Sequence, residues 1–183
     1  EVLISSGSIE RPIVFGNNDT PGVMLSSAAK EYLKVYGVLV GKNPLIFTNN
    51  DSGYETAIEF KKNGVNSIIL DTRKDPKSEI VDEAKNLGIN IKFSYVVVAA
   101  KGYKKVKSAD IAKISDNKEE LSELENIKCD CICVSGFWTP TIHLASQSGN
   151  KTKFNEDIDA FVPGSSKQNE KTLGAANGIY TLD

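Results

Sequence analysis

The residues with the spacing of a nucleotide-binding turn occupy positions 48–53 and read Thr-Asn-Asn-Asp-Ser-Gly. A dinucleotide fingerprint needs glycines between a strand and a helix, because the backbone must approach a pyrophosphate at the start of the helix. Here asparagine side chains stand in the turn, Gly53 is its one glycine, and Asp51 would face the phosphates with a negative charge. Asp71 follows about 20 residues later, where a ribose-binding acid belongs. The sequence therefore favours a Rossmann-like unit whose turn has lost phosphate binding.

The three thiols and the single histidine are the other candidate ligands. Cys129, Cys131 and Cys133 alternate along a predicted strand, and we expect Cys131 to point away from the other two. Residues two apart on a strand are poorly placed for a disulfide, and a zinc site needs about four ligands. We expect buried, reduced, structural thiols, as in a cytoplasmic protein. We expect His143 to pack or hydrogen-bond in a loop, and we predict no metal site.

Other catalytic patterns are absent from the sequence. It contains no P-loop, no nucleophile elbow and no C-x-x-C pair. The carboxylates fall mainly on predicted helix faces and within residues 119–125, where a solvated surface is their default role. We therefore predict no catalytic residue on this chain.

Hydrophobic periodicity predicts the elements that position these residues. Short apolar strands are predicted over 44–48, 67–71 and 89–93, separated by two helices. The first helix is predicted to begin at Ser52, which forms the S-x-x-E spacing of a capping box with Glu55. This β-α-β-α-β order indicates a parallel sheet covered by helices, a three-layer Rossmann-like α/β fold.

The remaining segments are predicted with less regular patterns. Thr20 and Pro21 favour the start of a helix that ends near Gly37, and a second such start is predicted at Asp75 and Pro76. The rest of the chain is predicted to form a small antiparallel meander over 95–114 that turns near Gly102, an exposed hairpin or short helix over 115–128, a buried strand over 129–135, and a loop-rich segment over 136–149.

The length, composition and charge limit the classes of protein to which this chain can belong. The chain has 183 residues, is 40% hydrophobic and 25% charged, and carries a net charge of −2, as an ordinary soluble domain does. This balance gives no footprint for nucleic acid or an anionic membrane, and no apolar run approaches the roughly 20 residues of a bilayer span. An apolar run follows Glu1 without a basic segment, so we expect a piece of a larger protein rather than a signal peptide.

Several segments together resemble the alpha subunit of heterotetrameric sarcosine oxidase. They are residues 6–15, 17–19 and 21–24, residues 48–52 with Tyr54, residues 134–140 with His143 and Leu144, residues 146–149, and residues 174–178. Their order and spacing cover almost the whole chain. The sequence departs from the family at residues 5–8, where a Thr-Gly-Ala stretch is usual, and at Phe137, where a second glycine is usual.

The resemblance implies a glutathione-reductase-type FAD/NAD(P)-binding fold in which one nucleotide domain is interrupted by another. Residues 1–16 would end the first half of the split domain, residues 17–140 would form the inserted Rossmann-like domain, and residues 141–183 would return to the split domain. In such a subunit NAD is held by the alpha chain. The implied cofactor-binding residues are Gly7, Ser8, Gly174, Ala175 and Asn177, since small residues let a nucleotide approach the backbone.

The resemblance also implies an activity for the parent enzyme. The family oxidises sarcosine to glycine with oxygen and forms peroxide, with FAD in the beta subunit and FMN between alpha and beta. The partners would be the beta, gamma and delta subunits. This chain alone would bind no cofactor and would be inactive. Two rival functions stay open: an NAD(P)H-binding reductase domain that uses residues 48–53, and a non-enzymatic scaffold that only joins subunits.

Overall fold

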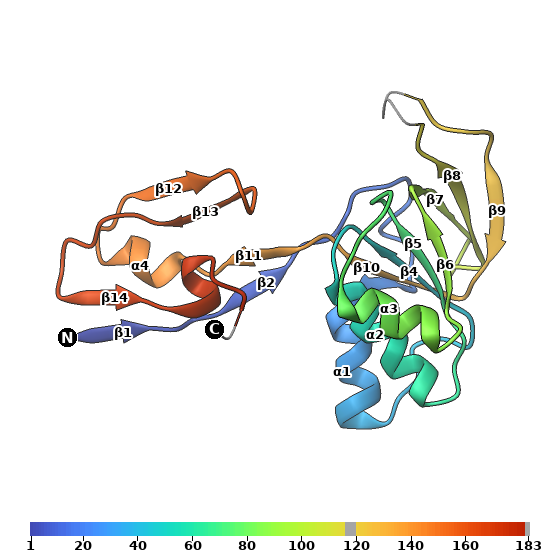
Figure 1. The fold of residues 1–183 in the computed structure, drawn as a ribbon, viewed down its shortest axis with the longest axis horizontal. Helices are drawn as coiled ribbons and strands as arrows, with labels where there is room; N and C mark the ends of the chain where they lie inside the picture. The colour runs from blue at the N-terminus through green and yellow to red at the C-terminus, as the bar shows by residue number, and fades with distance from the viewer. Residues whose placement is uncertain (116–119, 182–183) are drawn as a thin grey trace. The chain divides into compact units, whose positions relative to one another are not determined.

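The computed structural model describes residues 1–115 and 120–181, and the chain divides into two compact units. The first unit combines Glu1–Arg11 with Trp138–Asp183, and the second unit is Pro12–Phe137 (Figure 1). No helix among the described residues combines the length and the apolar character that a bilayer crossing requires.

A parallel sheet forms the centre of the second unit. Its strands lie in the order β3, β10, β4, β5, β6, and every neighbouring pair is parallel. Their bounds are β3 Val23–Leu25, β4 Pro44–Thr48, β5 Ile68–Asp71, β6 Asn90–Phe93 and β10 Cys131–Ser135. The predictions over 44–48, 67–71 and 89–93 are confirmed as β4, β5 and β6. The apolar runs of β4 and β5 suit buried strands, whereas β6 alternates apolar and polar residues at the edge of the sheet.

Three helices cover one face of this sheet, and Figure 1 shows them gathered on the same side. They are α1 Ser26–Tyr36, α2 Ser52–Lys62 and α3 Glu79–Asn86. Side chains alternate along β4, so Ile46 packs beneath the helices while Leu45 and Phe47 face the other layer. The three-layer arrangement predicted from the sequence is confirmed.

An antiparallel meander covers the other face. It consists of β7 Tyr95–Lys101, β8 Ser108–Lys113 and β9 Glu125–Lys128. Its side chains Val97 and Ile111 belong to the hydrophobic core between the meander and the sheet. The meander predicted over 95–114 is confirmed. Of the exposed hairpin or short helix predicted over 115–128, the described residues form the hairpin: Leu121 bridges Ile114, and β9 pairs antiparallel with β8. Residues 116–119 lie outside the described residues.

Two predicted helix starts and one predicted helix cap are wrong. The segment after Pro21 is a strand before it is a helix, because Val23–Leu25 pairs with β10 and α1 begins only at Ser26. The third helix begins after Ser78 rather than at Asp75 and Pro76. The capping box fails because Ser52 is already the first residue of α2, and its N–H is capped by another side chain.

The cysteines also differ from the prediction. Cys131 and Cys133 share the helix-covered face of β10 with sulfurs 3.7 Å apart, since residues two apart on a strand point the same way. Cys129 precedes the strand and lies in the core of the opposite face, where burial raises the pKa of its thiol to about 12. All three thiols are free and buried, as predicted.

The first unit is built from short paired strands. β1 Val2–Ile4 runs parallel to β14 Glu170–Thr172, β2 Ser8–Glu10 pairs with β11 Trp138–Pro140, and β12 Thr152–Asn155 pairs with β13 Ala160–Pro163. Two short helices complete it, α4 His143–Gln147 and the 3₁₀ turn η1 Gly174–Asn177. The loops predicted over 136–149 are therefore wrong, because β11 and α4 occupy most of that segment. His143 opens a helix rather than lying in a loop.

Phe137 stands at the boundary between the two units with an unusual backbone conformation. Its φ is +81°, a region that glycine adopts readily and a bulky side chain rarely does. The resemblance places a glycine at this position. The chain therefore keeps the turn of a glycine while carrying an aromatic residue.

Candidate functional site

The turn at residues 48–53 lies at the carboxyl edge of the parallel sheet, between the ends of β4 and β10. Thr48 and Ser135 are the last residues of these strands, they pair in register, and both are fully buried. Ligands of open α/β sheets bind outside the carboxyl ends of the strands, at the point where the strand order changes direction. In this sheet β4 joins onward to β5 on one side and neighbours the last strand, β10, on the other. This is the place where a dinucleotide would be expected.

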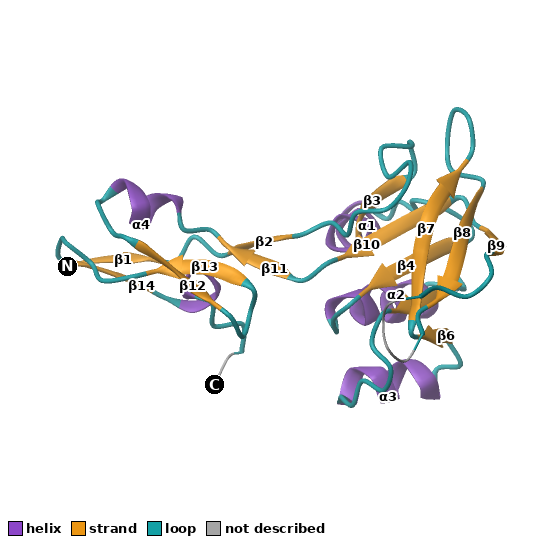
Figure 2. Ribbon diagram, turned by 90° about the horizontal axis from the view of Figure 1, so that it is seen from above, coloured by secondary structure: helices purple, strands orange, loops and turns teal. Residues whose placement is uncertain are grey.

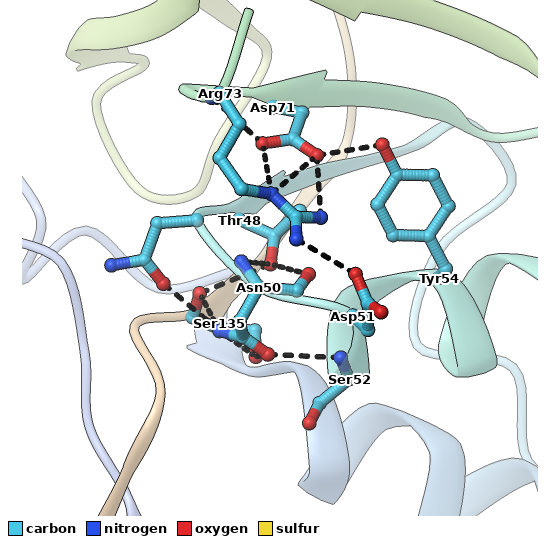
Figure 3. Close-up of polar contacts among 9 residues, drawn as sticks. Thr48, Asn50, Asp51, Ser52, Tyr54, Asp71, Arg73 and Ser135 are labelled. Carbon is cyan, nitrogen blue, oxygen red and sulfur yellow. Dashed lines mark hydrogen bonds and ion pairs between the residues drawn. The ribbon is translucent and has the colours of Figure 1, made fainter. Parts of the chain in front are cut away.

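The side chain of Asn50 fills that place. Its amide nitrogen donates to the carbonyl oxygen of Ser135 at 3.0 Å, and its amide oxygen accepts from the N–H of Ser52 at 2.9 Å (Figure 3). Asn50 is only 6% exposed. The chain itself therefore occupies both the gap between the strand ends and the first N–H of α2, which a phosphate would need.

The glycine pattern of the turn is lost in two positions and kept in one. Thr48, Asn50 and Gly53 have the spacing of the three fingerprint glycines. A β-carbon on Gly53 would lie 2.7 Å from the β-carbon of Thr48, which is too close for any real contact. Gly53 therefore keeps the role of the third glycine, close packing of the helix on the strand. The two positions that would admit a pyrophosphate carry side chains.

The carboxylate of Asp71, at the end of β5, is already engaged by neighbouring side chains. Asp71 is fully buried, accepts a hydrogen bond from the hydroxyl of Tyr54 at 2.7 Å, and pairs with Arg73 at 2.8 Å. The same arginine reaches across the turn to Asp51, with 2.8 Å between the charged atoms. Figure 3 shows Arg73 lying between the two carboxylates. A ribose hydroxyl would have to displace these partners to reach Asp71.

The pKa values of Tyr54 and Arg73 are both raised, which favours the protonated forms that donate hydrogen bonds in this cluster. Burial, followed by the hydrogen bond to Asp71, raises the pKa of Tyr54, so the tyrosine stays a donor. Burial lowers the pKa of Arg73, but hydrogen bonds to Asp71 and Asp51 outweigh it and the pKa is raised. Two carboxylates and one guanidinium leave these three groups with a negative balance. A negative balance beside a turn filled by Asn50 is unfavourable for a phosphate.

A cavity of about 640 Å³ opens beside the arginine in the second unit. One side is formed by Thr72, Arg73 and Lys74 after β5, and the apolar side by Val96, Ile114 and Leu121 of the meander. Among the described residues, the lining contains no histidine, cysteine or carboxylate. Among the same residues, no group of three or more potential metal ligands comes together. The carboxylates at this edge, Asp51 and Asp71, are both paired with Arg73.

The predicted cofactor residues all lie in the first unit, at the carboxyl edge of its parallel pair. β1 ends at Ile4 and β14 at Thr172, and the N–H of Leu173 donates to the carbonyl of Ile4 at 2.8 Å. Gly7 and Ser8 follow β1, and Gly174, Ala175 and Asn177 form η1 directly after β14. Because the two strands are parallel and adjacent, the two segments leave the same edge.

This second edge has bare backbone where the first has side chains. A β-carbon added to Gly7 or Gly174 would meet no atom within 4 Å, and both residues have positive φ, +75° and +59°. Asn177 borders a cavity of about 260 Å³ with Gly164 and Thr172. Open space over backbone amides is what an approaching nucleotide requires, so these residues fit the cofactor that the resemblance implies.

Sequence reasoning missed three members of the closed site. Arg73 and Ser135 were not predicted to act there, and Tyr54 was noted only as part of a resemblance. The one signal in the sequence was the spacing of Arg73, two residues after the acid at the end of a strand. Ser135 is 85 residues from Asn50, so only the pairing of β10 with β4 brings them together.

No protein-family model matches the chain. Among curated proteins it is 32% identical over 182 residues to the sarcosine oxidase alpha subunit of Corynebacterium sp. (strain P-1), covering 98% of this chain and 19% of that protein. It is 36% identical over 184 residues to the corresponding subunit of Rhizobium meliloti, covering 96% of this chain and 17% of that protein. The chain is thus related to sarcosine oxidase alpha subunits, and spans less than a fifth of their length.

Solved structures share the fold at low sequence identity. Thioredoxin reductase of T. acidophilum superposes with a TM-score of 0.74 at 17% identity, covering 96% of this chain and 57% of that chain. L-proline dehydrogenase of P. horikoshii superposes with a TM-score of 0.62 at 21% identity, covering 96% of this chain and 29% of that chain. The predicted glutathione-reductase-type fold is confirmed by these and related disulfide reductases.

Proposed function

Since this chain is related over nearly its whole length to part of sarcosine oxidase alpha subunits, we propose that it supports cofactor binding and structure in such a subunit. The parent protein would be a flavin-dependent oxidoreductase that converts sarcosine to glycine and forms peroxide. FAD would lie in a beta subunit, FMN between alpha and beta, and NAD in the alpha subunit. The chain's own residues would bind and position a nucleotide and would take no part in the oxidation.

The observation that carries the proposal is the contrast between the two sheet edges. The edge of β4 and β10 is closed by Asn50 and by the Asp71–Arg73 pair. The edge of β1 and β14 presents Gly7 and Gly174 toward open space. A nucleotide held by this chain would therefore lie against the first unit, with Gly7, Ser8, Gly174, Ala175 and Asn177 along its path.

The domain organisation follows from the same proposal. Residues 1–16 and 141–183 would be two parts of one split nucleotide domain, and residues 17–140 would be a second α/β domain inserted into it. A first unit built from both ends of the chain supports this assignment. In this arrangement the inserted domain would hold no nucleotide at its own turn.

A nucleotide titration of the intact alpha subunit tests the residue assignment. Gly174→Val places a branched side chain over the backbone, and we expect it to weaken NAD binding roughly tenfold, or about 1.4 kcal/mol. The matched control is Asn49→Ala, which alters the exposed residue of the closed turn and should leave the affinity unchanged. A loss of affinity in the Asn49 variant alone would favour the rival NAD(P)H-binding reductase domain.

A second experiment separates an active domain from a supporting one. We expect the purified chain to form no peroxide when mixed with sarcosine and oxygen, because the carboxylates at the closed edge, Asp51 and Asp71, are both held by Arg73. Sarcosine-dependent peroxide formation by this purified chain would contradict the supporting role. The scaffold alternative would be favoured if the assembled enzyme contained no nucleotide near Gly174.

A further inference from the structure

The loop between β7 and β8 concentrates positive charge on a protruding turn. Residues 101–107, named here the basic loop, contain Lys101, Lys104, Lys105 and Lys107 around a tyrosine. Lys128 of β9 lies beside the loop, because it pairs with Ser108. Figure 2 shows the loop projecting past the ends of both strands, at the upper right of the view.

The backbone of the basic loop is held in place. Val106 is fully buried, and its N–H donates to the carbonyl of Pro21 at 2.9 Å. The N–H of Lys107 donates to the carbonyl of Lys101 at 2.8 Å, which closes the turn. Gly102 has φ of +151°, and a β-carbon there would lie 1.9 Å from the carbonyl oxygen of Lys105. Only glycine fits this turn, so the lysines are presented on a fixed scaffold.

The charges of the basic loop are mostly unneutralised. Lys101 pairs with Asp110 at 2.9 Å. Within residues 1–115 and 120–181, no ion pair or hydrogen bond engages the side chains of Lys104, Lys105 or Lys107. Like charges held close together repel, and this chain has a net charge of −2. The loop is therefore a local positive surface on an acidic chain, and a negative partner would relieve its repulsion.

An aromatic side chain stands at the tip of the same loop. Tyr103 is 92% exposed, more than any other large hydrophobic residue described. Tyrosine combines a large apolar ring with a hydroxyl and is enriched among the residues that anchor protein interfaces. Lysines around one exposed aromatic residue form a polar rim about an apolar anchor.

We propose that the basic loop docks into an acidic surface on a different protein subunit, with the ring of Tyr103 buried in an apolar recess there. The inference rests on the proposed function, since the relatives are named as alpha subunits and therefore have partner chains. A protein partner is favoured over nucleic acid because the chain as a whole is acidic and would repel an extended polyanion. The lysines would steer association and Tyr103 would slow dissociation.

Charge reversal in the intact multisubunit protein tests the electrostatic part. The double change Lys104→Glu and Lys105→Glu should weaken association of the alpha subunit with its partners roughly tenfold at low salt, and less at high salt. The matched control is Lys151→Glu with Lys153→Glu, two exposed lysines of the first unit that give the same net charge. Equal association of the two variants would overturn the inference.

Cross-linking identifies the partner. A photoreactive phenylalanine derivative at position 103 should join the alpha subunit to a different polypeptide of the complex, through a segment rich in Asp and Glu. Adducts only within the chain, to a second copy of it, or to added single-stranded DNA would overturn the inference. Isolation of the alpha subunit without any partner chain would also overturn the inference. The flavin content and the amine oxidation of the preparation report separately on the proposed function.

Discussion

Each unit of this chain has parallel strands whose carboxyl ends meet at one edge, but the residues that follow the strands differ between the two edges. In the second unit, β4 and β10 end beside a turn that is filled by the side chain of Asn50, and Arg73 forms ion pairs with Asp51 and Asp71 there. In the first unit, β1 and β14 end in segments whose glycines, Gly7 and Gly174, face open space. Parallel strands bring backbone groups to one edge in both cases, but only bare backbone can receive a pyrophosphate. The architecture of a nucleotide fold and its ability to bind a nucleotide are therefore separate properties.

Removing the central acid should damage the closed edge most. Asp71→Ala leaves the hydroxyl of Tyr54 and the guanidinium of Arg73 without their buried partner, and should lower the free energy of unfolding by about 3–5 kcal/mol. Urea denaturation measures the loss. The control is Asp75→Ala, since that carboxylate is 70% exposed and should change the stability little. Equal losses in both variants would show that the Asp71 cluster does not hold the edge together.

Crowding at the closed edge gives the next largest effect. Gly53→Ala would normally favour a helix, but the added β-carbon would lie 2.7 Å from that of Thr48. We expect a loss of about 2 kcal/mol in the free energy of unfolding. Thr48→Gly removes the clash but also the hydrogen bonds of the Thr48 hydroxyl, so the double variant Gly53→Ala with Thr48→Gly should lose less stability than the sum of the two single losses. A stabilised single variant would contradict the close packing of α2 on β4.

Alkaline pH should open the closed edge gradually. The folded pKa of Tyr54 is raised above its ordinary value of 10.0, so its contribution to stability is complete below pH 10 and is lost as the pH rises further. This one group should lower the free energy of unfolding by at most about 1.4 kcal/mol per pH unit. Denaturation of Tyr54→Phe should show a shallower alkaline slope than that of the unsubstituted chain. Identical slopes would exclude Tyr54 as a source of the pH dependence.

The smallest effect is expected at the open edge. Gly7→Ala meets no neighbouring atom and adds only the strain of φ at +75°, about 1 kcal/mol. Gly7→Asn should recover most of this loss, because asparagine tolerates the left-handed region. Thermal denaturation of both variants distinguishes strain from contact. A loss as large as that of Gly53→Ala would mean that the edge of β1 is packed rather than open.

Part of the sheet could be predicted from the sequence because residues 44–48 and 68–71 are continuous apolar runs. The asparagines of the turn predicted that side chains rather than bare backbone stand there, and the side chain of Asn50 does. The strand at Val23–Leu25 could not be predicted, because three apolar residues before a helix look like its first turn. The pairing of β3 with β10 depends on a contact between residues more than 100 positions apart.

The hydrogen-bond and ion-pair partners in the closed site could not be predicted from the sequence. Ser52 has the spacing of a capping residue, yet the side chain of Asn50 caps its N–H instead. Local spacing identifies candidate hydrogen bonds, and competing partners decide between them. The link from Arg73 to Asp51 joins the ends of two different strands, so it becomes visible only once β4 and β5 are paired.

Hydrogen–deuterium exchange of the intact alpha subunit, with and without NAD, tests most directly where the nucleotide lies. NAD should slow exchange in residues 5–8 and 173–178 of the first unit and leave residues 49–53 unchanged. In that turn the N–H groups of Asn49, Asn50 and Ser52 already donate to acceptors of the chain itself. Slower exchange confined to residues 49–53 would contradict the account, since it would place the nucleotide at the edge that Asn50 and Arg73 close.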